Sequence, residues 1–578
     1  MTLLHVNRLS VGYGAQAVVD TLSFKLRRGE SVGLVGESGS GKSQTALAIL
    51  GLLPAQAAVS GSVRFRGNEL LGATGRQLDV VRARGIGMVF QDPMQALNPY
   101  LRVGRQLREI LVRHGIAQGR SADRRVIEML DRVGLPDPDR QFRAWPHELS
   151  GGMRQRVMIA AALIAEPRLL IADEPTTALD VTVQAQILDL LEDLRDNTAL
   201  LLITHDLGIV AGRCERMLVL ERGRLVETGP TTSVFAAPQH SHTRALLAAA
   251  PRIARDAAPG PVKGSTLLAV EKASVCYRGR NRRDLMAVSD VSFSLRRGET
   301  VAVVGESGSG KTSLVRAMLG LIPLCAGKVV YAGEPLEGPV ERRAQVQRRD
   351  LQLVFQDPAS ALNPEMRVGR IVEEPLLVHE PGADRDERRE RVMAILDRVG
   401  LDARFLGRYP HQLSGGQAQR VAIARALVLE PRVLICDEAV AALDGTVRQQ
   451  VLALLQEAQR KTGLAVLFIS HDLAVMHAIS HRVLVMYLGR LVELADNAKL
   501  FESPRHPYTR ALLDSVPVPD PVAVTRRAPL RGEVPSPVDP PAGCVFHPRC
   551  PAAQAQCRSQ QPALRDLSGS RVACHFPL

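Results

Sequence analysis

Two glycine-rich stretches decide the fold of this 578-residue chain: Gly36-Glu37-Ser38-Gly39-Ser40-Gly41-Lys42-Ser43 and Gly305-Glu306-Ser307-Gly308-Ser309-Gly310-Lys311-Thr312. Each follows an apolar run of the kind that forms a buried strand, at residues 31–35 and 301–304. A helix is expected to begin after Lys42 and after Lys311, so that each loop joins a strand to a helix. This strand–GxxxxGK[S/T]–helix pattern predicts a phosphate-binding loop in both places.

The residue types in these loops suit a nucleotide. Glycines let the backbone turn its N–H groups toward an anion, and the helix that follows adds its positive N-terminal end. We expect Lys42 and Lys311 to reach the β- and γ-phosphates of ATP, and the hydroxyls of Ser43 and Thr312 to bind Mg²⁺. The other predicted ATP-binding positions of the loops are Gly36, Ser38, Gly39, Gly41, Gly305, Ser307, Gly308 and Gly310.

The loops belong to a longer internal repeat. Further blocks occur twice in the same order: Val-Phe-Gln-Asp-Pro at 89–93 and 354–358, Leu-Ser-Gly-Gly at 149–152 and 413–416, Asp-Glu at 173–174 and 437–438, and His-Asp at 205–206 and 471–472. A repeated order of this kind means two copies of one domain. We expect a first domain at residues 1–247, a Pro- and Ala-bearing linker at 248–265, a second domain at 266–515, and a Pro-rich tail with four cysteines at 516–578.

Short Val, Leu and Ile runs alternate with helical stretches in each copy, which indicates an α/β domain with a mainly parallel sheet. One such run ends in Asp173-Glu174 in the first copy and in Asp437-Glu438 in the second. Parallel strands present ligands at their carboxyl ends, so the aspartates are expected beside Mg²⁺ and the glutamates are candidate bases for an attacking water. The alternative is that each acidic pair caps the turn that follows.

Leu149-Ser150-Gly151-Gly152 resembles the signature motif of ATP-binding-cassette (ABC) proteins, and it lies shortly before the Asp-Glu strand, as in that family. The resemblance extends from Tyr13 to the tail and implies two P-loop NTPase domains of the ABC ATPase type in tandem, each with a helical subdomain. It also implies roles for further pairs: adenine stacking for Tyr13 and Tyr277, contact with Mg²⁺ and the membrane subunits for Gln91 and Gln356, joining of the two sites for Asp180 and Asp444, and contact with the γ-phosphate for His205 and His471. The alternative for His205, which follows an apolar run, is a hydrogen-bonded core residue.

The family geometry implies that each ATP lies between the P-loop of one copy and the signature motif of the other. Ser150-Gly151-Gly152 and Ser414-Gly415-Gly416 each open a helix and so offer backbone donors to phosphate. Lys42 would then work with Ser414, and Lys311 with Ser150; ATP would join the halves and hydrolysis would release them. The second copy replaces the Pro-Thr that follows Asp-Glu with Ala-Val, but the carboxylates remain. We expect two competent sites whose rates need not be equal.

The segments at residues 90–99, 355–364 and 503–513 resemble the extended glutamine loop and the C-terminal motif of dipeptide, oligopeptide and nickel importers. This resemblance implies an ATP-hydrolysing motor on the cytoplasmic face of the inner membrane, with two transmembrane permease subunits and an extracytoplasmic substrate-binding protein as partners. Peptides are the expected cargo, and nickel and a glutathione-like substrate are alternatives. A tandem ABC ATPase of ribosomes or DNA repair is disfavoured, because the expected linker is short rather than a long charged helix.

Four cysteines gather in the tail: Cys544, Cys550, Cys557 and Cys574. Four thiols at such spacing predict a metal site, and thiolates suit Zn²⁺ or a [4Fe–4S] cluster. The residues alone favour zinc, the resemblance to peptide-importer ATPases implies the cluster, and unligated thiols in a disordered tail are a third alternative. The other cysteines are expected to be single residues in apolar surroundings rather than disulfide partners: Cys214, Cys276, Cys325 and Cys436.

The formal charge of +13 is carried by dispersed Lys and Arg, which suits a solvated surface or nearness to an anionic membrane leaflet. Aromatic residues make up only 3%, which argues against a base-stacking nucleic-acid binder. No apolar run reaches the roughly 18 residues of a membrane span, and the first residues lack a basic region followed by an apolar block. We therefore expect a cytosolic protein without a nucleic-acid partner.

Overall fold

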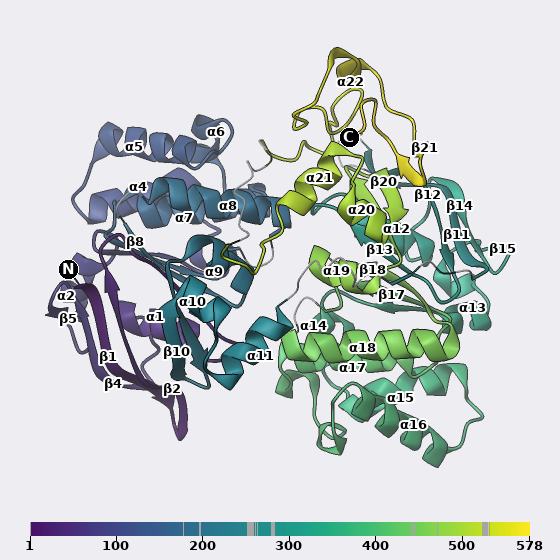
Figure 1. Cartoon of the computed structure of the whole chain (residues 1–578), viewed down its shortest axis with the longest axis horizontal. Coiled ribbons are helices and arrows are strands. Elements are labelled where there is room, and N and C mark those ends of the chain that lie inside the picture. Colours follow the sequence, from purple (N-terminus) through teal and green to yellow (C-terminus); the bar gives the residue numbers. More distant parts are fainter. Residues whose placement is uncertain are drawn as a thin grey trace. The chain divides into compact units, whose positions relative to one another are not determined.

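The computed structural model describes residues 2–578 except 38, 177–178, 196–197, 251–258, 261, 263, 279–283, 441–442, 444, 471, 523–529 and 531 (Figure 1). The side chains of residues 95, 359 and 446 are not described either. The chain divides into two compact units. The first comprises Met1–Leu179, Val183–Ala250 and Pro517–Arg527, and the second comprises Asp180–Thr182, Pro251–Val516 and Ala528–Leu578. Much of the expected linker at 248–265 lies outside the described residues.

The first unit is built around a six-stranded sheet. Its strands, in spatial order, are β10 (Arg224–Pro230), β9 (Arg216–Glu221), β3 (Ser31–Val35), β8 (Ala199–Thr204), β7 (Leu169–Asp173) and β6 (Ile86–Val89). β10 pairs antiparallel with β9, and the other neighbours in this sheet run parallel. The two strands predicted to lead into the phosphate loop and the Asp-Glu pair are β3 and β7, and all residues of both are buried.

Alternate residues of this sheet face two separate hydrophobic cores. Val32 and Leu34 of β3 belong to one core, whereas Leu170 and Ala172 of β7 belong to the other. Because side chains alternate across a strand, a sheet covered on both faces needs apolar residues at every position. This explains why the predicted strands are continuous apolar runs.

One core is closed by a second, four-stranded antiparallel sheet that the sequence analysis did not predict. Its order is β2 (Gln16–Arg27), β1 (Thr2–Tyr13), β4 (Ala57–Phe65) and β5 (Asn68–Glu69). The fold is therefore α/β with both parallel and antiparallel sheets. The alternation of apolar and polar residues along β2, with Leu22, Phe24 and Leu26 buried, is the local signal of this sheet.

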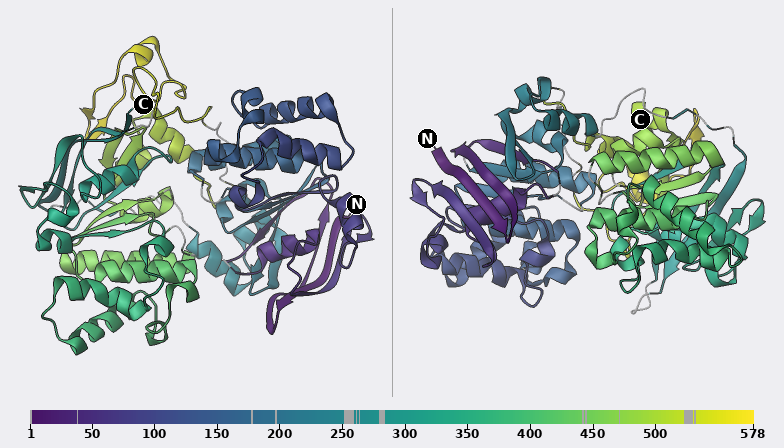
Figure 2. Two further views of the ribbon diagram at one scale, coloured as in Figure 1. Left: turned by 180° about the vertical axis from the view of Figure 1, so that it is seen from behind. Right: turned by 90° about the horizontal axis from the view of Figure 1, so that it is seen from below.

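Helices cover the other face, where α4, α5 and α7 pack on one another (Figures 1 and 2). The helices of this half of the chain are α1 (Lys42–Leu50), α2 (Gly75–Val81), α3 (Pro93–Ala96), α4 (Val103–Arg113), α5 (Gly119–Arg132), α6 (Pro138–Arg143), α7 (Gly151–Leu163), α8 (Val181–Leu194), α9 (Leu207–Arg213), α10 (Thr231–Ala236) and α11 (Ser241–Ala249). Helix α1 begins at the lysine of the first glycine-rich loop, as predicted.

The second unit repeats this plan with an extended sheet. The spatial order is β16 (Leu351–Val354), β17 (Val433–Asp437), β18 (Ala465–Ile469), β13 (Thr300–Val304), β19 (Arg482–Tyr487), β20 (Arg490–Asp496), β22 (Ser570–Val572) and β21 (Arg565–Leu567). Its antiparallel sheet has the order β12 (Leu285–Arg296), β11 (Thr266–Tyr277), β14 (Ala326–Tyr331) and β15 (Glu334–Pro335). The tail supplies β21 and β22, so its last part continues the sheet of the second unit, which differs from the separate tail that the sequence suggests.

The helices of the second half correspond to those of the first, except that a short 3-10 helix at Ala403–Phe405 stands in the place of α6 and that α22 is added in the tail. They are α12 (Lys311–Met318), α13 (Gln345–Asp350), α14 (Pro358–Ala361), α15 (Val368–His379), α16 (Arg385–Arg398), α17 (Gly415–Leu427), α18 (Gly445–Thr462), α19 (Leu473–Ile479), α20 (Asn497–Glu502), α21 (Pro507–Asp514) and α22 (Ala555–Ser559). Helix α12 begins at the lysine of the second loop. Cys544, Phe546 and Cys557 of the tail belong to one hydrophobic core of this unit.

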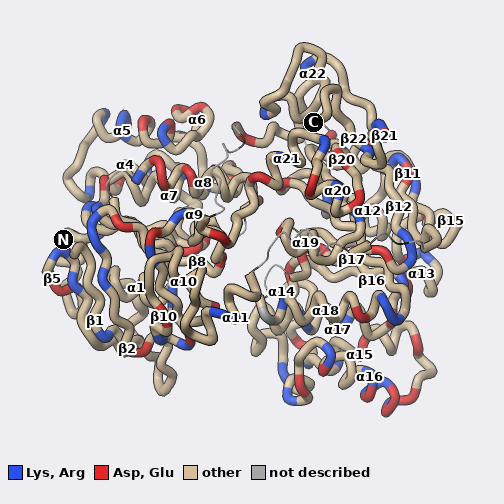
Figure 3. Tube along the Cα trace, in the orientation of Figure 1, with Lys and Arg blue, Asp and Glu red and all other residues tan. Residues whose placement is uncertain are grey.

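Basic and acidic side chains alternate along the outer helices, for example on α5 and α16 (Figure 3). Within the described part of the chain, no helix combines the length and the apolar character that a bilayer crossing requires.

Candidate functional site

The phosphate loops follow the central strands β3 and β13 and are shaped by their last glycines. Gly41 and Gly310 have φ values of 95° and 94°, which favour glycine. A Cβ atom at Gly41 would lie 2.6 Å from the carbonyl oxygen of Val18, and one at Gly310 would lie 2.3 Å from that of Ala287. Only glycine lets the backbone approach the neighbouring strand so closely while turning into α1 or α12.

Both loop lysines are buried and point back over their own loops. The Lys42 ammonium donates hydrogen bonds to the carbonyl oxygens of Gly36 and Glu37, at 2.9 and 2.8 Å. Lys311 Nζ donates to the equivalent carbonyls of Gly305 and Glu306, at 2.6 and 3.0 Å. Burial lowers the pKa of both lysines, and nearby carboxylates partly oppose this shift. The two ammonium groups are thus held where an anion would be bound above the loop.

Each loop hydroxyl meets the aspartate that ends a neighbouring strand. Ser43 Oγ donates to Asp173 Oδ1 at 3.1 Å, and Thr312 Oγ1 donates to Asp437 Oδ1 at 3.4 Å. Burial raises the pKa of both aspartates. A hydroxyl and a carboxylate side by side are the oxygen donors that Mg²⁺ prefers, so these residues fit the predicted ion.

Glu174 lies at the centre of the first site, where several of the predicted residues contact it. Its backbone has a φ of 45°, in the left-handed region, and its N–H donates to the carbonyl of Ile203 in β8 at 2.9 Å. The Gln91 side-chain amide donates to Glu174 Oε2 at 2.9 Å, and His205 Nδ1 lies 3.2 Å from Oε1. A non-glycine residue in this conformation is held by its surroundings, and such residues cluster at functional sites.

The second site repeats this arrangement. Glu438 has a φ of 51°, its N–H donates to the carbonyl of Ile469, and its Oε2 accepts a hydrogen bond from Gln356 Nε2 at 2.7 Å. His471 lies outside the described residues. The carboxyl ends of four parallel strands thus bring together the residues that the sequence analysis selected from distant blocks.

Other predicted site residues lie around these centres. Tyr13 donates to Gln44 Oε1 at 2.7 Å, and Tyr277 Oη lies 3.1 Å from Ser313 Oγ, so each tyrosine contacts the first turn of the helix after its loop. Gln44 and Ser313 were not among the predicted site residues, although both directly follow the loop hydroxyl. Asp180 directly precedes α8, and Ser38 and Asp444 lie outside the described residues.

The signature motifs open helices, as predicted. Ser150 is the N-cap of α7 and its Oγ accepts a hydrogen bond from the N–H of Met153 at 3.2 Å. Ser414 caps α17 in the same way through Gln417, whose side chain also accepts from the Ser414 N–H. Gly151 and Gly415 are exposed, and a Cβ atom there would meet nothing within 4 Å. The space above each helix end is therefore open to a ligand.

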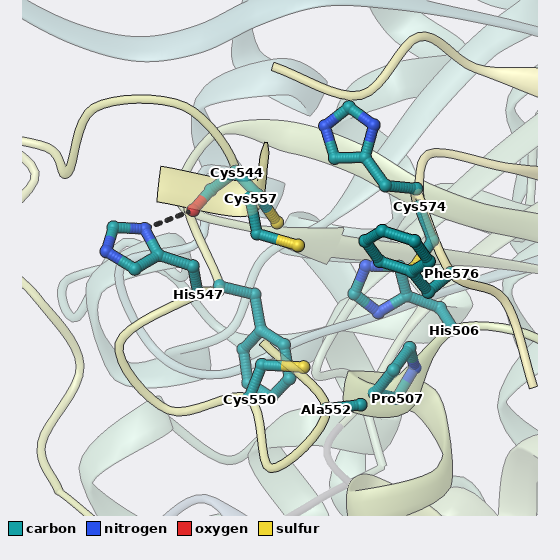
Figure 4. Close-up of a pocket in the computed structure, with 11 residues that line it drawn as sticks. His506, Pro507, Cys544, His547, Cys550, Ala552, Cys557, Cys574 and Phe576 are labelled. Atoms are coloured by element: carbon teal, nitrogen blue, oxygen red, sulfur yellow. Dashed lines mark hydrogen bonds between the residues drawn. The ribbon is translucent and has the colours of Figure 1, made fainter. Parts of the chain in front are cut away.

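The four tail cysteines line a single pocket, together with His506, His547 and Phe576 (Figure 4). Cys550 is half-buried and the other three are buried. Burial raises the pKa of Cys544 and Cys550, and that of Cys574 to about 11. In the part of the chain that the structure describes, no group of three or more His, Cys, Asp or Glu side chains is arranged to hold a metal ion. The thiols share a pocket without forming a ready-made ligand set.

The expectation of single cysteines is wrong for one pair, because Cys276 and Cys325 form a disulfide. The cause is strand pairing: Cys276 is in β11 and Cys325 directly precedes β14, its antiparallel neighbour. The Cys325 N–H donates to the carbonyl of Ser274, and the Cα atoms of Cys276 and Cys325 lie 5.9 Å apart. Cys214 and Cys436 are buried and free, as expected.

Comparisons with known proteins agree with this geometry. The family described as ABC transporter matches residues 19–177 and 288–441, and the family described as oligopeptide/dipeptide transporter, C-terminal region, matches residues 226–277 and 492–557. The chain is 48% identical over 523 residues to the peptidoglycan transport ATP-binding protein YejF of Agrobacterium fabrum, which covers 88% of this chain and 96% of that protein. It is 43% identical over 580 residues to the glutathione import ATP-binding protein GsiA of Pectobacterium atrosepticum, covering 93% of each. For GsiA of Escherichia coli the identity is 44% over 556 residues, with 89% and 88% covered.

A glycine substitution tests whether the loop geometry is needed. Gly310→Ala adds a Cβ atom that meets the Ala287 carbonyl, whereas Gly333→Ala, at a φ of 90°, adds one with nothing within 4 Å. In both variants the left-handed conformation of the alanine lowers the free energy of unfolding by about 1–2 kcal/mol. We expect the Tm of Gly310→Ala to be lower by several degrees more than that of Gly333→Ala, and its ATP binding to be weaker in a fluorescent-nucleotide titration. Equal behaviour of the two variants would contradict the close approach.

Proposed function

Because the chain belongs to the ABC transporter ATP-binding family, we propose that it is the ATP-hydrolysing motor of an importer, with one nucleotide site built on each phosphate loop. The observation that carries this proposal is the duplicated constellation at the carboxyl edge of each sheet. In both copies the loop lysine, the loop hydroxyl, the strand-ending aspartate and the left-handed glutamate occupy corresponding places. A protein that only bound nucleotide would have no need of a glutamate fixed in this way.

Each residue has a distinct part in hydrolysis. Lys42 and the loop N–H groups bind the phosphates, while Ser43 and Asp173 would hold Mg²⁺, which supplies charge stabilisation to the β- and γ-oxygens when bound. Glu174 orients a water and accepts its proton at a carboxylate oxygen. Gln91 and His205 fix the two oxygens of that carboxylate, so the base keeps one orientation. In the second copy, Lys311, Thr312, Asp437, Glu438 and Gln356 act alike.

The exposed ends of α7 and α17 support a head-to-tail use of the two copies. Each end presents free N–H groups to an anion, and each copy contributes one loop and one such end. We propose that the loop of Lys42 works with Ser414 and that of Lys311 with Ser150.

A cysteine pair tests this pairing. In a chain carrying Glu37→Cys and Ser414→Cys, both at exposed positions, we expect ATP to increase crosslinking by a short bifunctional thiol reagent. The control chain carries Glu37→Cys and Ser150→Cys, which are exposed positions of the same copy. Crosslinking of the control in preference to the cross-copy pair would overturn the head-to-tail arrangement.

The cargo is proposed to be a peptide or a peptide-like molecule. The match to the oligopeptide/dipeptide transporter C-terminal region occurs in both copies, and the related proteins are named for peptidoglycan transport and glutathione import. An importer of this kind needs permease subunits, and a substrate-binding protein outside the membrane would deliver the cargo. The extended loops at 90–99 and 355–364 would face the permeases from the cytoplasmic side of the inner membrane.

Glutamate substitutions test the hydrolytic function. We expect Glu174→Gln and Glu438→Gln each to lower steady-state ATP hydrolysis while leaving ATP binding intact, because the amide cannot accept the proton. The double variant should lose at least about 100-fold, the typical contribution of a general base. Full activity in Glu438→Gln with none in Glu174→Gln would show that the second site does not hydrolyse ATP.

The tail pocket is proposed to hold a [4Fe–4S] cluster, with Zn²⁺ as the alternative. Support comes from the chemistry of the donors: four thiols line one pocket, and the matched C-terminal region includes three of them, Cys544, Cys550 and Cys557. Four thiolates suit either occupant. The raised pKa values of Cys544, Cys550 and Cys574 mean that a bound cation would have to displace the protons of these thiols.

Metal analysis decides between these occupants. Protein purified without oxygen should contain about four iron and four sulfide per chain and show a thiolate-to-iron absorption band. Cys550→Ser should lose this metal, and Cys214→Ala, at a buried thiol in the first unit, should keep it. One zinc per chain would favour the alternative, and metal content independent of Cys550 would exclude the pocket.

A further inference from the structure

The two phosphate loops differ at one residue that their sequences share. Glu37 and Glu306 occupy the same motif position, directly after the first glycine. Glu37 is exposed, whereas Glu306 is only 1% exposed. An ionised carboxylate is buried at this level only when it is paired and hydrogen-bonded.

Two residues bind the Glu306 carboxylate: the Thr182 hydroxyl, which donates to Oε1, and an arginine of the tail, which supplies the counter-charge. Arg549 Nη1 lies 2.6 Å from Glu306 Oε2, and Nη2 lies 3.0 Å from Oε1, so the guanidinium grips both carboxylate oxygens. The Arg549 side chain is 2% exposed. Two-point contacts of this kind fix orientation as well as position. The carboxylate and Tyr487 raise the pKa of Arg549, which keeps its charge in place.

Aromatic residues hold this pair rigidly. The Glu306 N–H donates to the Tyr508 hydroxyl at 3.0 Å, and Arg549 Nη1 donates to that of Tyr487 at 3.4 Å. Phe546, three residues before Arg549, packs against both tyrosines with ring centroids 5.3 Å away. The Arg549 N–H also donates to the Phe546 carbonyl at 3.0 Å. The arginine therefore cannot shift without moving the aromatic core.

Glu306 connects this cluster directly to the phosphate lysine. Its backbone carbonyl accepts a hydrogen bond from Lys311 Nζ, so the position of Glu306 sets the position of that ammonium group. Lys42 makes the same contact with the carbonyl of Glu37. In the first copy, however, the described structure shows no buried arginine on the Glu37 side chain.

We propose that Arg549 is a positioning residue of the second nucleotide site: through Glu306 it fixes the phosphate loop of Lys311, so that ATP binding at this site depends on the tail while the first site does not. The inference rests on the proposed ATP-binding function. Arg549 directly precedes Cys550, so the segment that lines the thiol pocket also supports the loop. The tail thereby makes the two sites of one chain unequal.

The test reports on each site separately in the full-length protein. The chain is labelled with a photoreactive azido-ATP over a range of concentrations, and proteolysis with mass spectrometry assigns the label to each half. Arg549→Met should raise the azido-ATP concentration that half-saturates labelling of the second half by about 10–100-fold, the range typical of residues that support a ligand-contacting group. The half-saturating concentration for the first half should stay unchanged. Arg549→Lys should partly restore labelling of the second half. Arg558→Met, an exposed tail arginine, should change neither half.

Arg549→Met leaves the buried Glu306 carboxylate without a counter-charge, although the Thr182 hydroxyl still donates to it, so loss of folding in the second unit must be separated from loss of positioning. The double variant Glu306→Gln/Arg549→Gln removes both charges and should still show the shift in the second half alone. If the wild-type chain labels neither half, the proposed function itself fails. If the wild-type chain labels both halves and neither variant selectively shifts the half-saturating concentration of the second half, Arg549 merely anchors the tail and the inference is overturned. The inference is overturned as well if the tail becomes sensitive to protease without any change in labelling.

Discussion

The structure depends on a close approach of backbone to backbone after the central strand of each sheet. The chain leaves β3 and β13, turns at Gly41 and Gly310 within reach of a neighbouring carbonyl, and enters a helix at the lysine. Because of that turn, several backbone N–H groups and one ammonium group point toward the same phosphate-binding space. The remaining functional groups come from the ends of neighbouring parallel strands, which must meet at the same edge. The site is thus a consequence of strand order as much as of residue identity.

Much of this could be predicted because the chemistry is local. A glycine-rich turn between an apolar run and a helix, or an acidic pair ending such a run, can be recognised within about ten residues. The repeat then indicated which local patterns belong together. Contacts such as that between Gln91 and Glu174 join blocks that are far apart in the sequence. The residues alone did not assign these blocks to one site; the family resemblance did.

The parts that were missed depend on pairing between distant segments. The Cys276–Cys325 disulfide follows from the register of β11 and β14, which no local pattern gives. The antiparallel sheets were overlooked because buried and exposed residues alternate along strands such as β2, whereas the central strands are short runs that are buried throughout. The buried pair of Glu306 and Arg549 could not be foreseen either, since a glutamate in a phosphate loop and an arginine in a tail are ordinarily solvated.

The tail attaches to one copy for a reason that lies in the sheet edges. In the first unit β10 is the outer strand, its residues are half-buried or exposed, and it ends in a proline, which suits an edge that must not pair further. In the second unit the equivalent strand β20 is almost wholly buried, because β22 adds to it and the tail covers it. Glu493 of β20 is then 0% exposed and accepts hydrogen bonds from the N–H groups of Arg505 and His506 at the start of α21. Glu227 makes the same contacts with the N–H groups of Gln239 and His240 in the first unit. What differs in the second unit is Tyr508, whose hydroxyl accepts a hydrogen bond from the Glu306 N–H of the phosphate loop. A duplicated domain can therefore acquire unequal sites without any change in its motifs. This happens when an additional segment pairs with the sheet edge of one copy and the other copy has no such segment.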